Sequence, residues 1–122
     1  MSWNFNDERP IYLQLMEQIQ LRIVSGLYKV GEKLPSVREM ASDASVNPNT
    51  MQKALTELER TGLVYSQRTS GRFITEDSNM IKDIRNELAK EQIEKFLYNM
   101  EKIGYTKKET IELIEIVSKE MK

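Results

Sequence analysis

A tight corner between two short helical patterns is the feature that most limits how this chain can fold. Apolar residues recur at three- and four-residue spacing on both sides of Ser45–Pro48, over about residues 36–61, as they do in helices with one buried face. Asn47 is a favourable N-cap, and Pro48 suits the first helical position, where its missing N–H costs nothing. We therefore expect two helices that meet at a sharp corner, with Gly62 ending the second.

Two hydroxyl residues are each followed three positions later by Glu, which is the spacing of a capping box. Ser36 and Glu39 precede the first helix of the corner, and Thr106 and Glu109 lie near the end of the chain. In each pair we expect the hydroxyl oxygen to accept from the backbone N–H of the Glu. We expect the Glu carboxylate to accept in return from the backbone N–H of the Ser or Thr. Both pairs therefore predict helix starts.

Three more helical patterns lie outside the corner. The first opens at Pro10 and ends at Gly26, the second runs over about 80–103 and ends at Gly104, and the third follows Thr106. In every pattern the apolar positions share one face, and we expect these faces to be buried. The positions are Tyr12, Leu15, Met16, Ile19 and Ile23; Val37, Met40, Ala41 and Ala44; Met51, Ala54, Leu55 and Leu58; Ile81, Ile84, Leu88, Ile93, Phe96, Leu97, Met100 and Ile103; and Ile111, Leu113, Ile114, Ile116, Val117 and Met121.

Two short stretches predict a β-hairpin. Residues 63–67 and 72–75 are rich in β-branched and aromatic side chains, and the turn-forming residues 68–71 lie between them. The segments 27–35 and 76–79 show no helical or strand period, so we expect a loop and a linker there.

The composition argues against several classes of protein. The 122 residues include no Cys and no His, which removes disulfides, thiol chemistry, the commonest general base and the commonest metal ligand. We therefore expect no metal site, no cofactor and no enzymatic activity. Glu57 and Glu59 are two residues apart on a helix, so they do not face each other. We interpret them as a solvated surface rather than an acid/base pair.

Charge and hydropathy bear on the partners of the chain. No apolar run is long enough to span a bilayer, and residues 1–8 lack the basic start and apolar stretch of a signal peptide. We therefore expect a cytoplasmic protein with no membrane partner. The net charge of −1 gives no overall sign of nucleic-acid binding, so that case depends on where the charges lie.

The predicted order of helix, corner, helix and hairpin is that of a winged helix-turn-helix, mainly α with a small β wing at about 63–75. In this fold the second helix of the pair lies in the DNA major groove, and its N-terminal residues meet the base edges. Its first turns carry no carboxylate, and their polar side chains suit base or phosphate contacts. These side chains belong to Asn47, Asn49, Thr50, Gln52 and Lys53. Basic residues also gather in the segments expected to face DNA, namely Lys33, Arg38, Lys53, Arg68 and Arg72.

A series of short motifs stands in order along the same region. They are Pro10-Ile11-Tyr12 with Gln14, Gly31-Glu32-Lys33-Leu34-Pro35-Ser36-Val37-Arg38-Glu39-Met40-Ala41, Val46-Asn47-Pro48-Asn49-Thr50, Ala54-Leu55-Thr56-Glu57-Leu58-Glu59 and Gly62-Leu63-Val64. In this register they resemble the GntR family of bacterial transcription regulators, over about residues 10–75. The resemblance implies a sequence-specific DNA-binding regulator. It also implies repression as the usual mode, with a transporter operon and the regulator's own gene as targets.

The resemblance implies roles for individual residues. Arg38 matches the family arginine that contacts a base or phosphate, and Ser36 matches a position that can touch the DNA backbone. The positions that match the start of the recognition helix are Asn47, Asn49, Thr50 and Gln52, and those that match the wing tip, which reaches towards the minor groove, are Arg68 and Thr69.

The wing departs from the family pattern Gly-x-Gly-Thr-Phe-Val. Thr69 stands where the first glycine is expected, and Arg72 replaces the small hydroxyl residue. We therefore expect a less tightly turned wing and an added phosphate contact from Arg72.

The residues after the wing indicate the branch of the family. Dividing the chain into a DNA-binding domain at 9–77 and a second domain at 78–122 leaves about 45 residues for the latter. That is too few for a metabolite pocket or for an aminotransferase domain with pyridoxal phosphate. Two antiparallel helices with wide apolar faces instead resemble the YtrA-like branch, in which they form a homodimer, and a twofold dimer implies a palindromic operator. The expected dimer residues are Ile84, Leu88, Phe96, Leu97, Met100, Leu113, Ile114 and Val117.

Three questions stay open at this stage. The alternative function is a winged-helix module that binds another protein and has lost DNA binding. Trp3 and Phe5 either fix the N-terminal arm to the core or the dimer, or stay disordered. An unidentified small-molecule effector is possible, but no set of residues points to its site.

Overall fold

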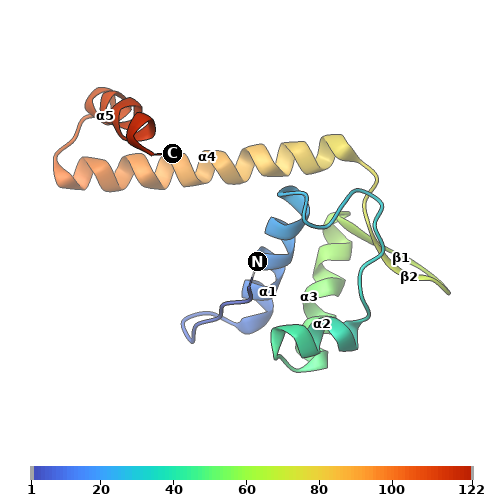
Figure 1. The fold of residues 1–122 in the computed structure, drawn as a ribbon. Coiled ribbons are helices and arrows are strands. Elements are labelled where there is room, and N and C mark those ends of the chain that lie inside the picture. Colours follow the sequence, from blue (N-terminus) through green and yellow to red (C-terminus); the bar gives the residue numbers. More distant parts are fainter. Residues whose placement is uncertain (1, 122) are drawn as a thin grey trace. The chain divides into compact units, whose positions relative to one another are not determined.

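The computed structural model describes residues 2–121. The chain divides into two compact units, the first ending at Arg85 and the second beginning at Asn86, inside the longest helix and beyond the predicted boundary at 77/78. The described residues form helices α1 (Ile11–Val24), α2 (Val37–Ala44), α3 (Pro48–Thr61), α4 (Ser78–Ile103) and α5 (Lys107–Glu120) and strands β1 (Val64–Gln67) and β2 (Gly71–Ile74) (Figure 1). The predicted class, mainly α with a small β wing and a helical C-terminal part, is confirmed.

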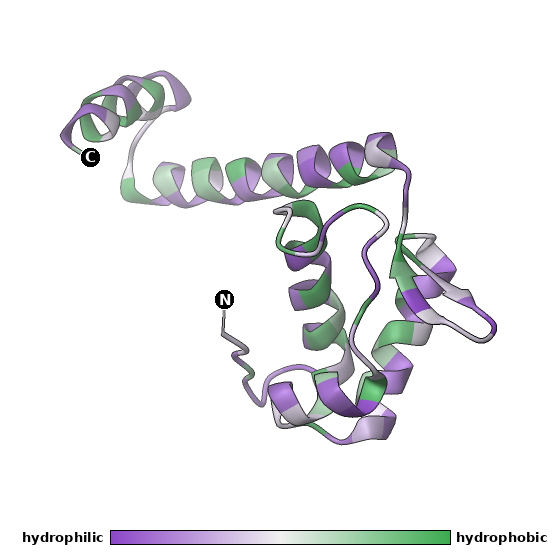
Figure 2. Ribbon diagram, turned by 45° about the vertical axis from the view of Figure 1, so that its right-hand side comes forward, coloured by the Kyte–Doolittle hydropathy of each residue, from purple (hydrophilic) through white to green (hydrophobic). Residues whose placement is uncertain are grey.

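An apolar core between α1, α2 and α3 holds the first unit together. Figure 2 shows hydrophobic residues on the faces that α1 and α3 turn towards each other. Tyr12, Met16 and Val37, which were predicted on the same faces, are only half-buried. Burying one large aliphatic side chain stabilises a fold by about 1.5–3 kcal/mol. The most completely buried apolar side chains are those of Leu15, Ile19, Ile23, Met51, Leu55, Leu58, Leu63, Val64 and Ile74.

The corner between α2 and α3 forms as predicted. Asn47 caps α3 by accepting a hydrogen bond from the backbone N–H of Asn49 at 2.7 Å, and Pro48 takes the first helical position. Ser45 ends α2 in the left-handed region at φ 56°, the one positive φ among the described non-glycine residues. Its backbone N–H bonds back to carbonyls at the end of α2. The two helix ends are therefore satisfied by local groups.

One of the two predicted capping boxes is complete. The hydroxyl of Thr106 accepts from the N–H of Glu109 at 3.1 Å, and the Glu109 carboxylate accepts from the N–H of Thr106 at 3.0 Å. These backbone and side-chain hydrogen bonds lower the pKa of Glu109. At α2, Ser36 accepts from the N–H of Glu39 at 3.1 Å, but the Glu39 carboxylate bonds to the Ser36 hydroxyl instead of its backbone. The reciprocal half of that box was a wrong prediction, because the Glu39 carboxylate accepts from the Ser36 hydroxyl at 3.2 Å.

The wing contains a third segment. β1 and β2 pair antiparallel as the expected hairpin, but Gly71 lies in β2, opposite Gln67, and not in the turn predicted at 68–71. The segment before α2 runs along the other edge of β2, where Lys33 forms a bridge with Phe73 and the N–H of Leu34 donates to the carbonyl of Arg72 at 2.9 Å. The prediction of a plain loop over 27–35 is therefore wrong at its end. Backbone pairing of this kind leaves no trace in side-chain periodicity.

The helix α4 begins two residues before the predicted start at Met80, so the predicted linker at 76–79 is shorter. Asp77 explains the difference, because its carboxylate accepts from the N–H of Met80 at 3.0 Å and so caps the first turn. Neither α4 nor another helix within residues 2–121 is long and apolar enough to cross a membrane.

The N-terminal arm lies on the first unit. The indole N–H of Trp3 donates to the carboxylate of Asp43 in α2 at 2.9 Å, and the guanidinium of Arg22 in α1 lies 3.5 Å from the Trp3 ring centroid. The Trp3 and Phe5 rings stack with their centroids 6.4 Å apart. Two glutamine side chains of α1 bond to the backbone of the arm. Of the alternatives for these aromatic residues, attachment to the core is the one observed.

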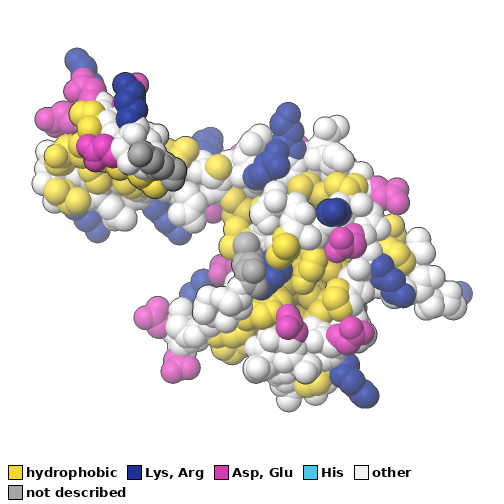
Figure 3. All heavy atoms as spheres, in the orientation of Figure 1, with side chains coloured by type: hydrophobic (Ala, Val, Ile, Leu, Met, Phe, Trp, Pro, Cys, Tyr) yellow, Lys and Arg dark blue, Asp and Glu magenta, His cyan; other side chains and the backbone are white. Residues whose placement is uncertain are grey.

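The second unit leaves most of its apolar side chains on the surface (Figure 3). Among its described residues, Thr110 alone is buried. Phe96, Ile114 and Val117, three of the expected dimer residues, are each more than 40% exposed. The others are half-buried, namely Leu88, Leu97, Met100 and Leu113 in this unit and Ile84 in the first. The apolar faces predicted for α4 and α5 therefore have no core of their own within one chain.

Replacing Leu55 with Ala tests the buried face of α3. We expect the free energy of unfolding to fall by about 2–5 kcal/mol, because the change leaves a cavity in the core. Thr56→Ala, at the exposed neighbouring position, is the matched control and should change it by less than about 0.5 kcal/mol. Urea unfolding followed by circular dichroism measures both, and equal losses would contradict the assignment.

Candidate nucleic-acid interface

The start of α3 presents polar side chains to solvent. Its apolar face is buried in the core, so Asn49, Gln52 and Lys53 are exposed and Thr50 is half-buried. The first turn carries no acidic residue. The free N–H groups and the positive end of the helix dipole favour a phosphate at this end. The side-chain oxygen of Asn47 is already engaged in the helix cap, which leaves its NH₂ group as the donor.

Arg38 lies on the exposed side of α2, one residue into the helix. It borders a hollow of about 600 Å³ together with Tyr28 and Asp43. Burial raises the pKa of the Tyr28 phenol; Asp43 and Glu32 raise it as well, and Arg22 opposes them. The phenol is therefore protonated at neutral pH and is a hydrogen-bond donor beside Arg38.

A groove of about 700 Å³ lies between the start of α2 and the wing. Among the predicted site residues it brings together Ser36, Thr69 and Arg72, with Lys33 beside them, whereas Arg38 borders the neighbouring hollow. Gly71 permits this approach, since its φ is +108° and a Cβ there would lie 3.2 Å from Cε of Lys33. The wing therefore packs closely against Lys33 and the start of α2, and the groove lies between them.

The ammonium group of Lys53 is held by an aromatic ring. Its Nζ lies 3.8 Å from the ring centroid of Tyr12 at the start of α1. Such a cation–π contact contributes about 0.5–1 kcal/mol at an exposed site. Tyr12 therefore positions a charge near the start of α3 in addition to packing in the fold.

Glu59 is part of a network and not of a solvated surface. Its carboxylate accepts from the hydroxyl of Ser66 at 2.6 Å and forms an ion pair with Arg72. Partial burial alone would raise the pKa of Glu59, but these hydrogen bonds and the charge of Arg72 lower it below its usual value. The interpretation of Glu59 as solvated was wrong, whereas Glu57 forms an ion pair with the exposed Arg60 on its own helix.

The wing tip is exposed. Arg68 and Thr69 lie in the turn between β1 and β2, and the N–H of Ser70 donates to the carbonyl of Gln67 at 3.1 Å. Thr69 does not have a positive φ, so the turn does not require the glycine that Thr69 replaces. Arg68 is therefore presented at the end of the hairpin, where it is free of a carboxylate partner among the described residues.

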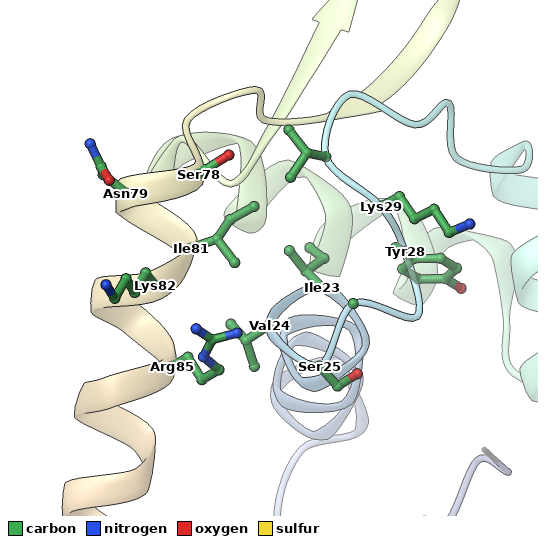
Figure 4. A pocket seen from close by; sticks show the side chains of 12 residues that line it. Ile23, Val24, Ser25, Tyr28, Lys29, Ser78, Asn79, Ile81, Lys82 and Arg85 are labelled. Atoms are coloured by element: carbon green, nitrogen blue, oxygen red, sulfur yellow. The ribbon is translucent and has the colours of Figure 1, made fainter.

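A separate pocket of about 590 Å³ lies between the end of α1, the loop after it and the start of α4 (Figure 4). Ile23, Val24 and Ile81 give it an apolar floor. In Figure 4 the Arg85 side chain reaches towards Val24, whereas Asn79 points away from α1. No residue of α3 lines this pocket, whereas three basic side chains do, those of Lys29, Lys82 and Arg85.

Two residues near the interface escaped sequence reasoning. The helical period places Tyr12 on a buried face without showing its contact with Lys53, and the Pro-Ile-Tyr motif is the one local sign of a further role. The spacing of Glu59 predicts a surface residue, and the sequence sign of its pairing is Arg72, a positive charge where the family pattern has a small hydroxyl residue. The sequence shows all four residues of the Tyr12–Lys53 and Glu59–Arg72 pairs, but only the tertiary fold shows which residue contacts which.

The chain matches the sequence pattern of a known family over the same segment. The family described as "Bacterial regulatory proteins, gntR family" matches residues 11–74, which is over half of the chain. The chain therefore belongs to the GntR family, as the motifs indicated.

Two relatives match along nearly the whole chain. The HTH-type transcriptional regulator YhcF of Bacillus subtilis (strain 168) is 42% identical over 112 residues, which cover 92% of this chain and 93% of YhcF. The HTH-type transcriptional repressor YtrA of the same strain is 34% identical over 114 residues, which cover 93% of this chain and 88% of YtrA. The second unit is thus part of the similarity.

Solved structures show the same fold. A GntR family transcriptional regulator from Listeria monocytogenes superposes with a TM-score of 0.84 at 41% identity, covering 91% of this chain and 97% of that one. The DNA-binding domain of AraR in complex with operator ORX1 superposes with a TM-score of 0.56 at 27% identity, covering 62% and 99%. The chain is therefore a DNA-binding transcription regulator and not an enzyme.

The Glu59–Arg72 pair predicts a pH-dependent share of stability. Because the pKa of Glu59 in the folded chain is below its ordinary value of 4.5, the pair stabilises the fold above about pH 4.5 and is lost as pH falls through the lower, folded pKa. We expect wild type to be more stable than Glu59→Gln at pH 7, with the gap closing in acid. Thermal unfolding between about pH 3 and pH 7 measures this, and a gap independent of pH would contradict it.

Proposed function

We propose that this regulator is a homodimeric repressor that binds a palindromic operator. The observation that carries the proposal is the second unit, which leaves Phe96, Ile114 and Val117 largely exposed and buries no apolar side chain among its described residues. Soluble monomers rarely keep such apolar patches. A second copy of the same chain offers a surface of the same kind.

A twofold dimer determines the form of the DNA site. Two copies of α3 related by a twofold axis meet two half-sites about one helical turn, roughly 34–36 Å, apart or a multiple of it. Inverted half-sites then follow from the symmetry of the protein. Within each half-site, we propose that Asn49, Thr50 and Gln52 meet base edges, with Lys53, Arg68 and Ser36 at phosphates or the minor groove.

Repression and the target genes rest on similarity. YtrA, which matches this chain along most of its length, is named a repressor. The resemblance to the YtrA-like branch makes a transporter operon and the regulator's own gene the first targets to test. A small-molecule effector stays a prediction without an assigned site.

The alternative function is a winged-helix module that binds protein and has lost DNA binding. The acid-free start of α3 argues against it, since a surface freed from DNA has no reason to exclude carboxylates beside the positive helix end. Membership of the GntR family argues in the same direction.

The experiment that tests the proposal is selection of bound duplexes from a random DNA pool at about physiological salt. We expect enrichment of a short inverted repeat. Enrichment of a site without inverted symmetry would contradict the twofold dimer. If no DNA is retained at all, the protein-binding alternative replaces the proposal.

Arg38→Ala tests the predicted base contact in the selected duplex. We expect specific binding to weaken by about 1–3 kcal/mol, because an arginine contact to a base edge is lost. Arg60→Ala is the matched control, since Arg60 lies at the far end of α3 and pairs with Glu57. Fluorescence anisotropy measures both affinities. Equal affinities for Arg38→Ala and wild type would show that Arg38 is not a DNA contact.

Val117→Asp tests the dimer surface. We expect the dimer to dissociate at least about tenfold more readily, because a carboxylate in an apolar interface loses its hydration. Lys119→Asp, also exposed on α5, is the control for the new charge and should leave the dimer intact. Sedimentation equilibrium gives the mass, and a wild-type mass of 14.3 kDa at micromolar concentration would contradict the dimer.

A further inference from the structure

One carboxylate near the end of α3 holds both strands of the wing. Glu59 accepts from Ser66 in β1 at 2.6 Å and from Nε of Arg72 in β2. Ser66 and Arg72 stand directly opposite each other in the hairpin. The hairpin is therefore attached to the recognition helix at one cross-strand pair, and this attachment uses charge and hydrogen bonds as well as apolar packing.

The same arginine reaches towards the predicted contact residues. Gln52 and Glu59 are seven residues apart, which places them on one side of α3 two turns from each other. Arg72 spans these two turns, because its Nη1 lies 3.5 Å from Oε1 of Gln52 while its Nε donates to Glu59. A guanidinium is planar and carries several donors in a fixed arrangement. Fixing one edge of Arg72 on Glu59 therefore fixes the other edge beside Gln52.

We propose that Glu59 is a positioning residue for DNA recognition, which fixes the wing against α3 through Arg72 and orients the amide of Gln52. A cation beside the amide holds its oxygen inward, so its NH₂ group is turned outward as a donor to a base acceptor. Glu59 itself touches no DNA in this arrangement. The inference rests on the proposed function, since it needs a duplex that the protein reads specifically.

The burial of the pair separates this role from that of an ordinary surface ion pair. The side chains of Arg72 and Glu59 are only 18% and 28% exposed. In the Glu57–Arg60 pair of the same helix, Arg60 is 75% exposed and the two residues are close in sequence. An exposed pair adds little and sets no geometry, whereas the partly buried pair joins two elements that meet only in the fold.

In this proposal Arg72 acts inside the protein, as a bridge between Glu59 and Gln52, in place of the phosphate contact expected from the sequence. The two roles differ in their dependence on salt. Each phosphate contact adds about one unit to the slope of log affinity against log salt. An arginine that only bridges two protein side chains changes the affinity by the same factor at every salt concentration, so the slope stays the same.

The test compares Glu59→Gln with Glu57→Gln as matched control, using the duplex that wild type enriches from the random pool. We expect Glu59→Gln to bind it about three- to tenfold more weakly with an unchanged salt slope. Glu57→Gln should stay within about twofold of wild type. Unchanged affinity for Glu59→Gln would overturn the proposal. Tighter binding with a steeper slope would also overturn it, since that outcome means Glu59 restrains a phosphate contact.

The base preference of the Glu59→Gln variant distinguishes a positioning role of Glu59 from a purely structural one. Repeating the duplex selection with Glu59→Gln, well below its unfolding temperature, should relax the preference at a base position that wild type reads strictly. Glu57→Gln should reproduce the wild-type motif. Lower thermal stability with an unchanged motif would show that Glu59 only stabilises the fold, and the proposal would fail.

A measurement without DNA decides the first step of the inference independently. Backbone ¹⁵N relaxation of the free protein should show lower order parameters for residues 67–71 in Glu59→Gln than in wild type or Glu57→Gln. Equal order parameters would overturn the attachment of the wing by Glu59, whether or not a duplex was enriched. If wild type enriches no duplex, the proposed function fails while this result still stands for or against the wing contact.

Discussion

The apolar face of α3 packs against α1 and α2 and continues into β1, so one helix joins the elements of the DNA-binding unit. Met51, Leu55 and Leu58 are buried there. Because the apolar face points inward, the polar residues at the start of the helix face outward, where Lys53 meets the ring of Tyr12 and Gln52 meets Arg72. The corner, the wing and the exposed polar residues of α3 all take their positions from this one burial.

The sequence predicted those parts of the structure that depend on residues close to one another in the chain. The cap at Asn47, the proline after it and the complete capping box at Thr106 need only a few consecutive side chains. The apolar stripes need only a helical period. The hairpin needed alternating residues around a turn, and it formed in the expected place.

The parts that were missed join residues far apart in the chain. Lys53 meets Tyr12, and Glu59 meets Arg72, only after α3 has packed on α1 and the wing has folded back. No local pattern selects one partner from the many charges and rings available. At Ser36 the error was smaller: the carboxylate of Glu39 has two donors within reach, and spacing alone does not choose between the hydroxyl and the backbone.

The attachment of the arm changes where this domain begins. The similarity to the family starts at residue 11, yet Trp3 already covers Arg22 and bonds to Asp43. Residues 2–10 form no helix or strand, but their backbone supplies partners to glutamines of α1. A chain cut at the family boundary would lose a ring that shields a buried guanidinium. The packed part of the first unit therefore extends at least to Trp3, beyond the segment that matches the family.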